Sequence, residues 1–310
     1  MTFPIYFNTK KTVNLFGVAE NFNFIKNLYL ENKLPKVLML TGKKGSGKST
    51  IINHLMYYIF DKDNYDEKNN IINNNSIFYK QFIDNIYSNI IYLSGNDFKN
   101  IKVDDIRDLK KNIYQTSISD KPRFIILDDI ELFNTNSLNG LLKIIEEPTN
   151  NNHFLLINNK SKTLIETIKS RCLDFKVILS EHKRLDIINS LISKFNVNPI
   201  IDPETSQLTP GNFIKFNYIC ESNKIIPNAN YLKNLTLLLN FYKKKRELLY
   251  VDMVLFLTDY YFSDLKNKSS LNNEKMIEYK TFIFENINKF FLYNLNQNAL
   301  LNAITNKIND

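Results

Sequence analysis

A glycine-rich run near the start of the chain has the composition and spacing of a phosphate-binding loop. Glycine is scarce, with seven in 310 residues, yet three of the seven lie in the run Gly42-Lys43-Lys44-Gly45-Ser46-Gly47-Lys48-Ser49-Thr50. In such a loop, successive backbone N–H groups point inward at a helix N-terminus and cradle phosphate oxygens. We expect Lys48 to reach the β- and γ-phosphates and the Ser49 hydroxyl to bind Mg²⁺. The run therefore predicts a site for ATP or ADP with Mg²⁺.

A second group of candidate residues follows an apolar segment that ends in two acids. The segment Phe124-Ile125-Ile126-Leu127 leads directly into Asp128-Asp129. An acid at the end of a buried strand can orient Mg²⁺ and its bound waters beside a phosphate loop. We therefore assign Asp128 to the metal site. Asp129 is a candidate for the base that activates a water molecule, a role that requires hydrogen-bond reach of roughly 2.6–3.2 Å.

The elements that position these residues alternate between short apolar segments and helical patterns. Apolar residues from Ile51 to Ile59 recur at helical spacing, so the loop is expected to join a strand to a helix. Another helix is expected from 103, with acids in its first turn, and another over 138–145 that stops at Pro148. This alternation predicts an α/β fold whose parallel sheet is covered on both faces. The expected strands are 36–41, 90–93, 124–127, 153–157 and 173–178.

The rest of the chain predicts further domains. The polar stretch 61–75, rich in Asn and Asp, is expected to be a loop or an irregular insertion. After about residue 180 the pattern is helical almost to the end, with breaks that include Pro210-Gly211 and 226–230. We infer a P-loop nucleotide-binding domain over 1–180, a small helical domain over 181–225 and a C-terminal all-α domain over 226–310.

Composition excludes several classes of protein. The hydrophobic share of 44% and the charged share of 23% are typical of a soluble globular protein. The sequence has no long apolar run and no signal-peptide pattern, so we expect no membrane span. Cys172 and Cys220 are too few for a four-thiolate zinc site, which favours a reducing cytoplasm and no zinc. The net charge of +8 is compatible with nucleic-acid contact, but scattered lysines do not establish it.

Two further motifs give the chain a specific family resemblance. The stretch Leu141-Leu142-Lys143-Ile144-Ile145-Glu146-Glu147-Pro148 and the later Ser170-Arg171-Cys172 resemble the LLK-x-LEEP and SRC signatures of bacterial DNA polymerase III clamp-loader subunits, which are AAA+ proteins. Between them, Phe154-Leu155-Leu156-Ile157-Asn158-Asn159 is similar to the family's sensor 1 strand, and Asn158 is the sensor candidate. Upstream, Ile101-Lys102-Val103-Asp104-Asp105-Ile106-Arg107-Asp108-Leu109 resembles a helix of the delta-prime branch.

The resemblance implies a AAA+ domain, a helical lid domain and a C-terminal collar that joins a hetero-oligomeric ring. Such a ring opens a sliding clamp and closes it around primed DNA, with ATP at the subunit boundaries. Arg171 would then act in trans, as an arginine finger in the site of a neighbouring subunit. The alternative for Arg171 is a surface salt bridge. The implied partners are the gamma or tau and delta subunits, with the sliding clamp and primer-template DNA reached through the complex.

Departures from the family pattern favour the delta-prime branch over the gamma and tau motor subunits. The motor subunits typically carry a zinc-binding cysteine module, whereas no cysteine precedes Cys172 here. Their sensor 2 Arg is matched by Ile214 in Gly211-Asn212-Phe213-Ile214, and the adjacent Lys215 is expected to point elsewhere. AAA+ proteins usually have Glu where this chain has Asp129, which is one methylene shorter. We therefore expect weak or absent ATPase activity in the chain alone.

Three other functions are compatible with parts of the sequence. A gamma-type motor ATPase is the nearest alternative, because the phosphate loop is intact. A P-loop kinase for small molecules would need a substrate lid and a base after the loop, and the 61–75 stretch offers neither. A purely structural binding module overlaps with the delta-prime interpretation, and loss of Arg171 would then leave the assembled ATPase unchanged.

Overall fold

A five-stranded sheet forms the centre of the N-terminal part of the protein, in strand order β4-β5-β6-β1-β7. Every neighbouring pair is parallel, and β1 lies between β6 and the edge strand β7. The predicted α/β class and parallel sheet are therefore confirmed, and each expected strand is found within two residues of its predicted ends. The strands are β1 (Val37–Thr41), β4 (Ile90–Ser94), β5 (Arg123–Asp128), β6 (Asn152–Asn158) and β7 (Leu173–Lys176).

The computed structural model describes residues 3–95, 103–114, 121–149, 151–268 and 273–309. Residues 101 and 102, with which the delta-prime-like motif begins, lie outside these ranges. None of the helices within the described ranges is long and apolar enough to cross a membrane.

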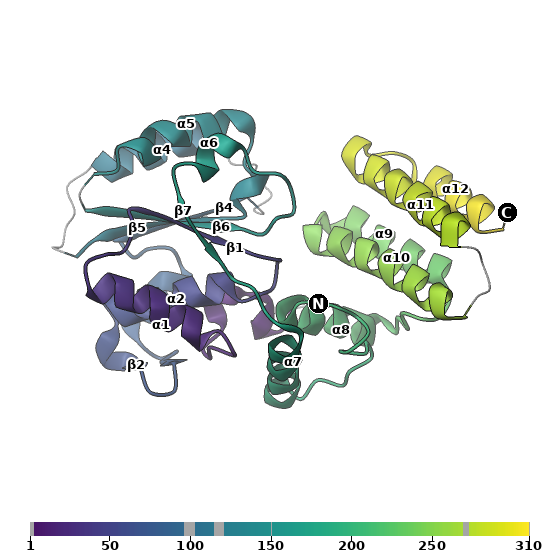
Figure 1. Ribbon diagram of the computed structural model, residues 1–310, viewed down its shortest axis with the longest axis horizontal. Coiled ribbons are helices and arrows are strands. Elements are labelled where there is room, and N and C mark those ends of the chain that lie inside the picture. The colour runs from purple at the N-terminus through teal and green to yellow at the C-terminus, as the bar shows by residue number, and fades with distance from the viewer. Residues whose placement is uncertain (1–2, 96–102, 115–120, 150, 269–272, 310) are drawn as a thin grey trace. The chain divides into compact units, whose positions relative to one another are not determined.

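Helices cover both faces of the sheet, as its buried strands require (Figure 1). All residues of β1 and β5 are buried, so neither strand has a solvent-facing side. One face packs against α1 and α2, and the other against α4 and α5, with the short α6 beside them (Figure 1). The bounds are α1 (Ala19–Leu30), α2 (Lys48–Phe60), α4 (Val103–Tyr114), α5 (Thr135–Glu146) and α6 (Glu166–Lys169).

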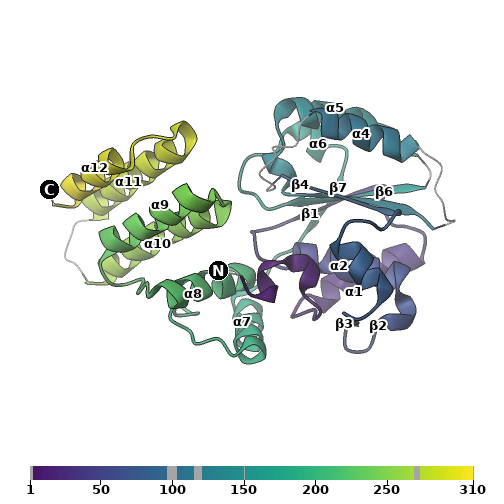
Figure 2. The ribbon, with the colours of Figure 1, turned by 180° about the vertical axis from the view of Figure 1, so that it is seen from behind.

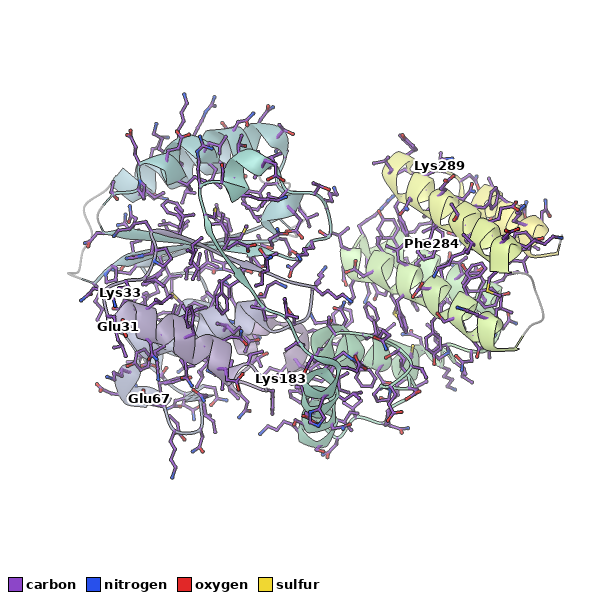
Figure 3. The ribbon with its side chains drawn as sticks, viewed as in Figure 1. Glu31, Lys33, Glu67, Lys183, Phe284 and Lys289 are labelled. Carbon is purple, nitrogen blue, oxygen red and sulfur yellow. The ribbon has the colours of Figure 1, made fainter. Side chains whose placement is uncertain are left out.

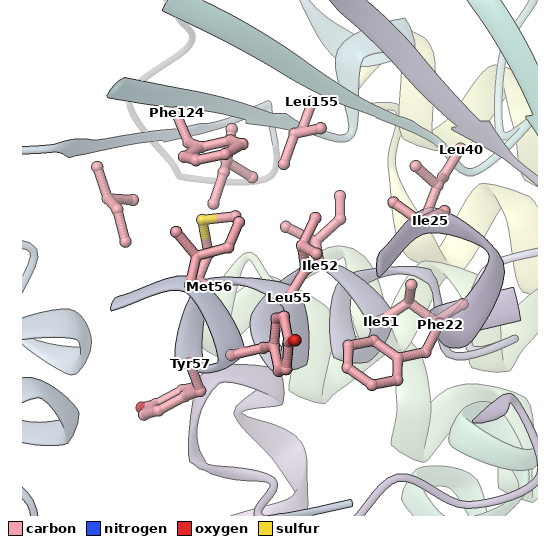
Figure 4. Close-up of a cluster of buried hydrophobic side chains, with 14 of the residues drawn as sticks. Phe22, Ile25, Leu40, Ile51, Ile52, Leu55, Met56, Tyr57, Phe124 and Leu155 are labelled. Carbon is pink, nitrogen blue, oxygen red and sulfur yellow. The ribbon is translucent and has the colours of Figure 1, made fainter. Parts of the chain in front are cut away.

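The core beneath the sheet is formed mainly by α2, the helix that starts in the glycine-rich loop. Figure 4 shows side chains of α2, among them Ile52 and Met56, directed at Phe124 and Leu155 of the strands above them. Ten of the thirteen α2 residues are buried, so the helix is fixed against the sheet along most of its length. This anchorage holds the loop at the helix N-terminus in a defined position.

The core above the sheet includes the predicted apolar face of α5. Leu138, Leu141 and Ile145 are buried, whereas Leu142 is half-buried at the edge of the cluster. The helix starts at Asn134, whose side chain accepts a hydrogen bond of 2.8 Å from the Ser137 amide. It ends at Glu146, two residues before Pro148, as the restriction on residues preceding proline predicts.

The stretch 61–75 is more ordered than the predicted loop. It holds a one-turn 3₁₀ helix, η3 (Lys62–Asn64), and a short antiparallel hairpin of β2 (Tyr65–Asp66) and β3 (Ile71–Ile72). The hairpin was not predicted, because it depends on tertiary contacts. Tyr65 is buried, and its hydroxyl lies 2.9 Å from the Nδ1 atom of His54 on α2. Local polarity does not reveal such an anchor.

Shorter elements complete the N-terminal part, and charged side chains cover its surface. They are η1 (Ile5–Phe7), η2 (Thr9–Lys11), α3 (Ile77–Ile83) and η4 (Ile130–Leu132). Lys33 and Glu31, labelled at the end of α1 in Figure 3, form an ion pair of 2.8 Å with both side chains more than half exposed. Exposed pairs of this kind contribute little to stability.

The chain after β7 is helical, as predicted. Its helices are α7 (Glu181–Phe195), α8 (Pro210–Asn223), α9 (Tyr231–Lys245), α10 (Leu248–Lys268), α11 (Asn273–Tyr293) and α12 (Gln297–Asn309). Helices α9 to α12 run alongside one another (Figure 2) and bury apolar residues such as Leu235, Leu238 and Met253. The contacts divide the chain into one unit of residues 1–195 and 208–215 and another of 196–207 and 216–310. The three-domain division at 180 and 225 stays a prediction.

Candidate nucleotide site

The glycine-rich loop joins β1 to α2 at the carboxyl edge of the sheet, in the predicted order of strand, loop and helix. Gly45 and Gly47 have φ angles of 81° and 95°, in the left-handed region that favours glycine. Gly47 is also the N-cap of α2, so the loop ends at the first backbone N–H groups of the helix, which have no acceptor within the helix. The loop therefore has the conformation that an anion site at a helix N-terminus requires.

Lys48 lies inside the loop rather than on the surface. Its side chain is only 2% exposed, and its ammonium group donates hydrogen bonds of 2.8 Å to the carbonyl oxygens of Gly42 and Lys43. Burial lowers the pKa of Lys48 to about 8, although the carboxylates of Asp128 and Glu131 act in the opposite direction. The loop thus carries a buried positive charge that a phosphate group could neutralise.

Ser49 and Asp128, the two residues predicted to hold Mg²⁺, lie together. The Ser49 hydroxyl donates to Oδ2 of Asp128 at 3.2 Å, and the Tyr92 hydroxyl donates to the same oxygen at 2.9 Å. The Asp129 amide donates to the other carboxylate oxygen, Oδ1, at 2.9 Å. Burial, followed by the charge of Asp129, raises the pKa of Asp128 to about 6. A hydroxyl and a carboxylate are ligands of the kind that Mg²⁺ prefers, so this pair fits the ion.

The candidate base Asp129 faces a different partner from Asp128. It is buried, has a left-handed φ of 50°, and its Oδ1 accepts a hydrogen bond of 2.7 Å from the Asn159 side chain. Asn158, the predicted sensor, instead accepts from the Lys160 amide at 2.9 Å. Successive side chains at the end of a strand point to opposite faces, so only one of the two asparagines reaches the acids. The structure brings Asn159 to them and not Asn158.

A buried glutamate that the sequence analysis missed fixes the backbone around Asn159. Glu131 is 5% exposed, and its carboxylate accepts hydrogen bonds from the Asn159 amide at 3.1 Å and the Ser161 amide at 3.1 Å. The Ser161 hydroxyl donates to it as well, at 2.7 Å. The one available signal was an acid flanked by the apolar residues Ile130 and Leu132.

A cavity of about 270 Å³ adjoins the loop and the acidic pair. Its walls are mixed, with polar groups at the loop end and aromatic or aliphatic side chains elsewhere, as in many small-molecule sites. Ile214 and Lys215 both line it, so the prediction that Lys215 points elsewhere was wrong. The lining includes Lys44 to Thr50 of the loop, Tyr92, Asp128, Asp129 and Asn159, with Tyr6, Phe7, Phe16, Ile187, Leu191 and Phe195.

The start of α8 is fastened to the tip of the loop. The Thr209 hydroxyl donates to the Lys44 carbonyl at 2.6 Å, and the Gly211 amide donates to the Gly45 carbonyl at 2.9 Å. A Cβ atom on Gly45 would lie 2.6 Å from the Thr209 hydroxyl oxygen, and one on Gly211 would lie 2.9 Å from the Cα atom of Gly45. Glycine at both positions allows this close approach.

Arg171 is not among the described residues that line the cavity. It follows α6, and its Nε atom donates to Glu146 at 2.7 Å while an NH1 hydrogen is donated to the Thr167 carbonyl at 2.8 Å. About a third of the side chain is exposed, so the chain by itself shows the surface ion pair that was the alternative for Arg171. The adjacent Cys172 is half-buried, and burial raises its thiol pKa to about 12, which suits a packing residue.

Comparisons of the sequence with known proteins identify relatives of this chain. The family model described as "DNA polymerase III, delta subunit" matches residues 18–179. In Buchnera aphidicola subsp. Schizaphis graminum, a DNA polymerase III subunit gamma is 34% identical over 94 residues, which are 30% of this chain and 26% of that protein. A DNA polymerase III subunit delta' from the same organism is 26% identical over 198 residues, or 61% of this chain and 60% of that protein.

A solved structure supports the fold alone. A DNA polymerase III gamma subunit-related protein from Thermotoga maritima aligns with a TM-score of 0.50 at 18% identity, covering 92% of this chain and 98% of that one. The matches to the two Buchnera relatives span 26% and 60% of those proteins' own lengths.

Proposed function

The chain belongs to the DNA polymerase III delta subunit family, and from this premise we propose that it is a delta-prime-like clamp-loader subunit. In this role it holds a nucleotide in its own loop, lends Arg171 to the ATP site of a neighbouring subunit, and hydrolyses ATP slowly or not at all. The observation that carries the proposal is the separation of these parts. Lys48, Ser49 and Asp128 meet beside the cavity, whereas Arg171 lies outside it with part of its side chain exposed.

The proposal of nucleotide binding rests on complementary groups at the two ends of the cavity. The loop supplies backbone N–H groups and the buried Lys48 ammonium for phosphates. Tyr6, Phe7 and Phe16 supply apolar and aromatic walls that suit a base. Ser49 and Asp128 would hold Mg²⁺, which would neutralise part of the phosphate charge.

Slow hydrolysis is proposed from the surroundings of Asp129. The Asp129 side chain, which is shorter than that of Glu, accepts a hydrogen bond from Asn159. The left-handed backbone at Asp129 fixes the direction in which this side chain leaves the strand. A general base must reach the attacking water at about 3 Å. A carboxylate held by an amide and shortened by one methylene is poorly suited to that task. Asn159, in the place proposed for Asn158, would sense the phosphate instead.

Action of Arg171 in trans requires a change of partner. In the chain alone, Glu146 neutralises the guanidinium, so the arginine must exchange or share this partner when it approaches a phosphate on a neighbouring subunit. The helices of 226–310 would form the collar of the ring and those of 181–225 a lid over the nucleotide. The proposed partners are the gamma or tau and delta subunits, with the sliding clamp and primer-template DNA in the assembled complex.

The test is a reconstituted complex in which DNA-stimulated ATPase is compared among variants. Arg171→Ala should lower turnover by at least about a hundredfold at the site that it completes. Lys169→Ala is the matched control, because Lys169 lies two residues away and pairs with Glu166 at 2.7 Å. Turnover that is equal for Arg171→Ala and Lys169→Ala would remove the arginine-finger role.

A gamma-type motor is the second candidate, favoured by the intact set of Lys48, Ser49 and Asp128. Lys48→Ala separates the two roles. Retained loading activity agrees with the delta-prime-like role, whereas loss of all loading activity indicates a motor. Lys33→Ala, which removes an exposed cation of an ion pair, is the control. Turnover on the order of 1 s⁻¹ by the isolated chain, at the low end for enzymes, would also contradict the delta-prime-like role.

A further inference from the structure

Tyr92 lies between Asp128, a residue of the predicted Mg²⁺ site, and the N-terminal segment formed by residues 5–12. It lies in β4, where its partner across the ladder is Ile126 of β5, and Asp128 follows two residues along the same face. A tyrosine can reach such a diagonal neighbour, and its hydroxyl donates to Oδ2 of Asp128 at 2.9 Å. The phenol therefore holds the carboxylate on the side away from the Asp129 amide, which donates to Oδ1.

The ring of Tyr92 is itself held by a buried cation. The ammonium group of Lys10 lies 3.6 Å from the ring centroid, and it is also hydrogen-bonded to the Asn85 side chain. Lys10 is only 8% exposed, so its charge depends on these partners within the protein. A cation over an aromatic face in a site shielded from water fixes the ring more strongly than the same contact at a surface.

Lys10 belongs to the segment that also forms a wall of the cavity. It lies in η2, next to Thr9, and Phe7 and Thr12 on either side of η2 also line the cavity. The segment 5–12 is thus linked to Asp128 through the contact of Lys10 with the Tyr92 ring and the hydrogen bond of the Tyr92 hydroxyl. A displacement of this segment would be transmitted to the carboxylate, because the ring and its hydroxyl are both engaged.

We propose that Tyr92 is a positioning residue for Asp128, and that Lys10 holds Tyr92 so that the N-terminal segment is coupled to the Mg²⁺ end of the nucleotide site. The inference rests on the proposed nucleotide site. It adds to that site a tyrosine and a lysine that neither contact a phosphate nor bind the metal in the proposal. In the proposed site Ser49 would donate its hydrogen to Asp128 and offer its oxygen to Mg²⁺, and Tyr92 would keep the shared acceptor oxygen of Asp128 in place.

The test is the gain in affinity for fluorescent ADP that Mg²⁺ produces, measured in the full chain as the ratio of Kd values in EDTA and in Mg²⁺. Tyr92→Phe keeps the ring but removes the hydroxyl, and it should reduce this ratio about tenfold, the effect of one hydrogen bond to a charged group. Affinity in EDTA should stay within about twofold of wild type, since no phosphate contact is changed. A purely structural effect would lower both affinities together.

A control variant, a second single variant and a double variant are measured in the same assay. Tyr87→Phe is the matched control, because Tyr87 packs on Phe60 and Phe78 rather than on the acids. Lys10→Met should reduce the Mg²⁺-dependent ratio in the same direction, and the Tyr92→Phe, Lys10→Met double variant should lose less than the sum of the single losses. Thermal unfolding without nucleotide identifies a variant that fails to fold. If Tyr92→Phe or Lys10→Met fails to fold, the Mg²⁺-dependent ratio of the other single variant tests the proposal.

The outcomes distinguish this inference from the proposed function. A wild-type chain with a Mg²⁺-dependent gain that Tyr92→Phe leaves unchanged overturns the positioning role alone. Equal loss in Mg²⁺ and in EDTA also overturns it. A wild-type chain that binds ADP in neither condition overturns the nucleotide site and the positioning role together.

Discussion

Acidification should destabilise the protein through His54, a residue buried on the helix that carries the phosphate loop. The imidazole is 0% exposed, its Nδ1 lies 2.9 Å from the Tyr65 hydroxyl, and burial lowers its pKa from the ordinary 6.5 to about 3. The native state therefore keeps His54 neutral, while the unfolded chain binds a proton near pH 6.5. Since the unfolded state holds more protons, stability falls as pH decreases between about 6.5 and 3.

The size of the effect follows from the pKa difference. At pH 5 the unfolded imidazole is 1.5 pH units below its own pKa, which corresponds to a loss of about 2 kcal/mol in the free energy of unfolding. Asp128 acts in the opposite direction, because its raised pKa of about 6 means that the native state binds a proton more tightly than the unfolded chain. The contribution of His54 must therefore be isolated as a difference between two proteins.

Urea unfolding of wild type and His54→Gln at several values between pH 7.5 and 5 provides that difference. The gap between the two free energies should narrow by about 2 kcal/mol from pH 7.5 to 5, because only wild type has the titrating imidazole. His182→Gln is the control, since 90% of the His182 side chain is exposed beside Asp186. Free energies that fall in parallel for wild type and His54→Gln would show that His54 is not held neutral, and the reasoning would be refuted.

Three further predictions concern the glycine-rich loop, the turn at Asn159 to Ser161 and the apolar core. Gly45→Ala should weaken binding of fluorescent ADP at least about tenfold, because a Cβ atom would lie 2.6 Å from the Thr209 hydroxyl oxygen at a φ of 81°; unchanged affinity in a nucleotide titration would contradict this. Glu131→Gln should lower the free energy of unfolding by about 1–3 kcal/mol in urea, because the Asn159 N–H, which lies 3.1 Å and 3.2 Å from the two carboxylate oxygens, would then face an NH₂ group in place of one acceptor; a loss below about 0.5 kcal/mol would argue against this role. Leu141→Ala should cost about 2–5 kcal/mol by creating a cavity, and the half-buried Leu142→Ala should cost clearly less, both measured by urea unfolding; equal costs would mean that Leu141 does not fill the core as described.

The strands were predictable because each is a short apolar run between polar segments, and both faces of a parallel sheet are buried. The segment 124–127, for example, has no polar residue that would allow a solvent-facing side. The hairpin at 65–72 was missed for the converse reason. Its sequence is polar, and what fixes it is Tyr65 inserted beside His54, eleven residues earlier on another element. Such a contact leaves no periodic pattern in the sequence.

In the candidate site, too, the residues of one local run were predictable and those that depend on tertiary contacts were not. The residues from Gly42 to Thr50 were predictable because one continuous run contains both the left-handed turns and the lysine. Tyr92 and Glu131 were missed because they act across strands, and a single tyrosine or glutamate has no characteristic spacing. Lys215 was assigned the wrong direction because the sequence does not specify how the start of α8 faces the cavity.

The backbone at Asp129 explains how two adjacent acids can have separate tasks. In a regular strand, neighbouring side chains point to opposite faces of the sheet. The left-handed conformation at Asp129 ends the strand and turns its carboxylate toward Asn159, while Asp128 stays with Ser49 and Tyr92. A non-glycine residue in this region carries a conformational cost, which the hydrogen bond from Asn159 helps to offset. The carboxylates of Asp128 and Asp129 are thus held by different side chains, so in the proposed site Mg²⁺ could be bound while the Asp129 carboxylate stays hydrogen-bonded to Asn159.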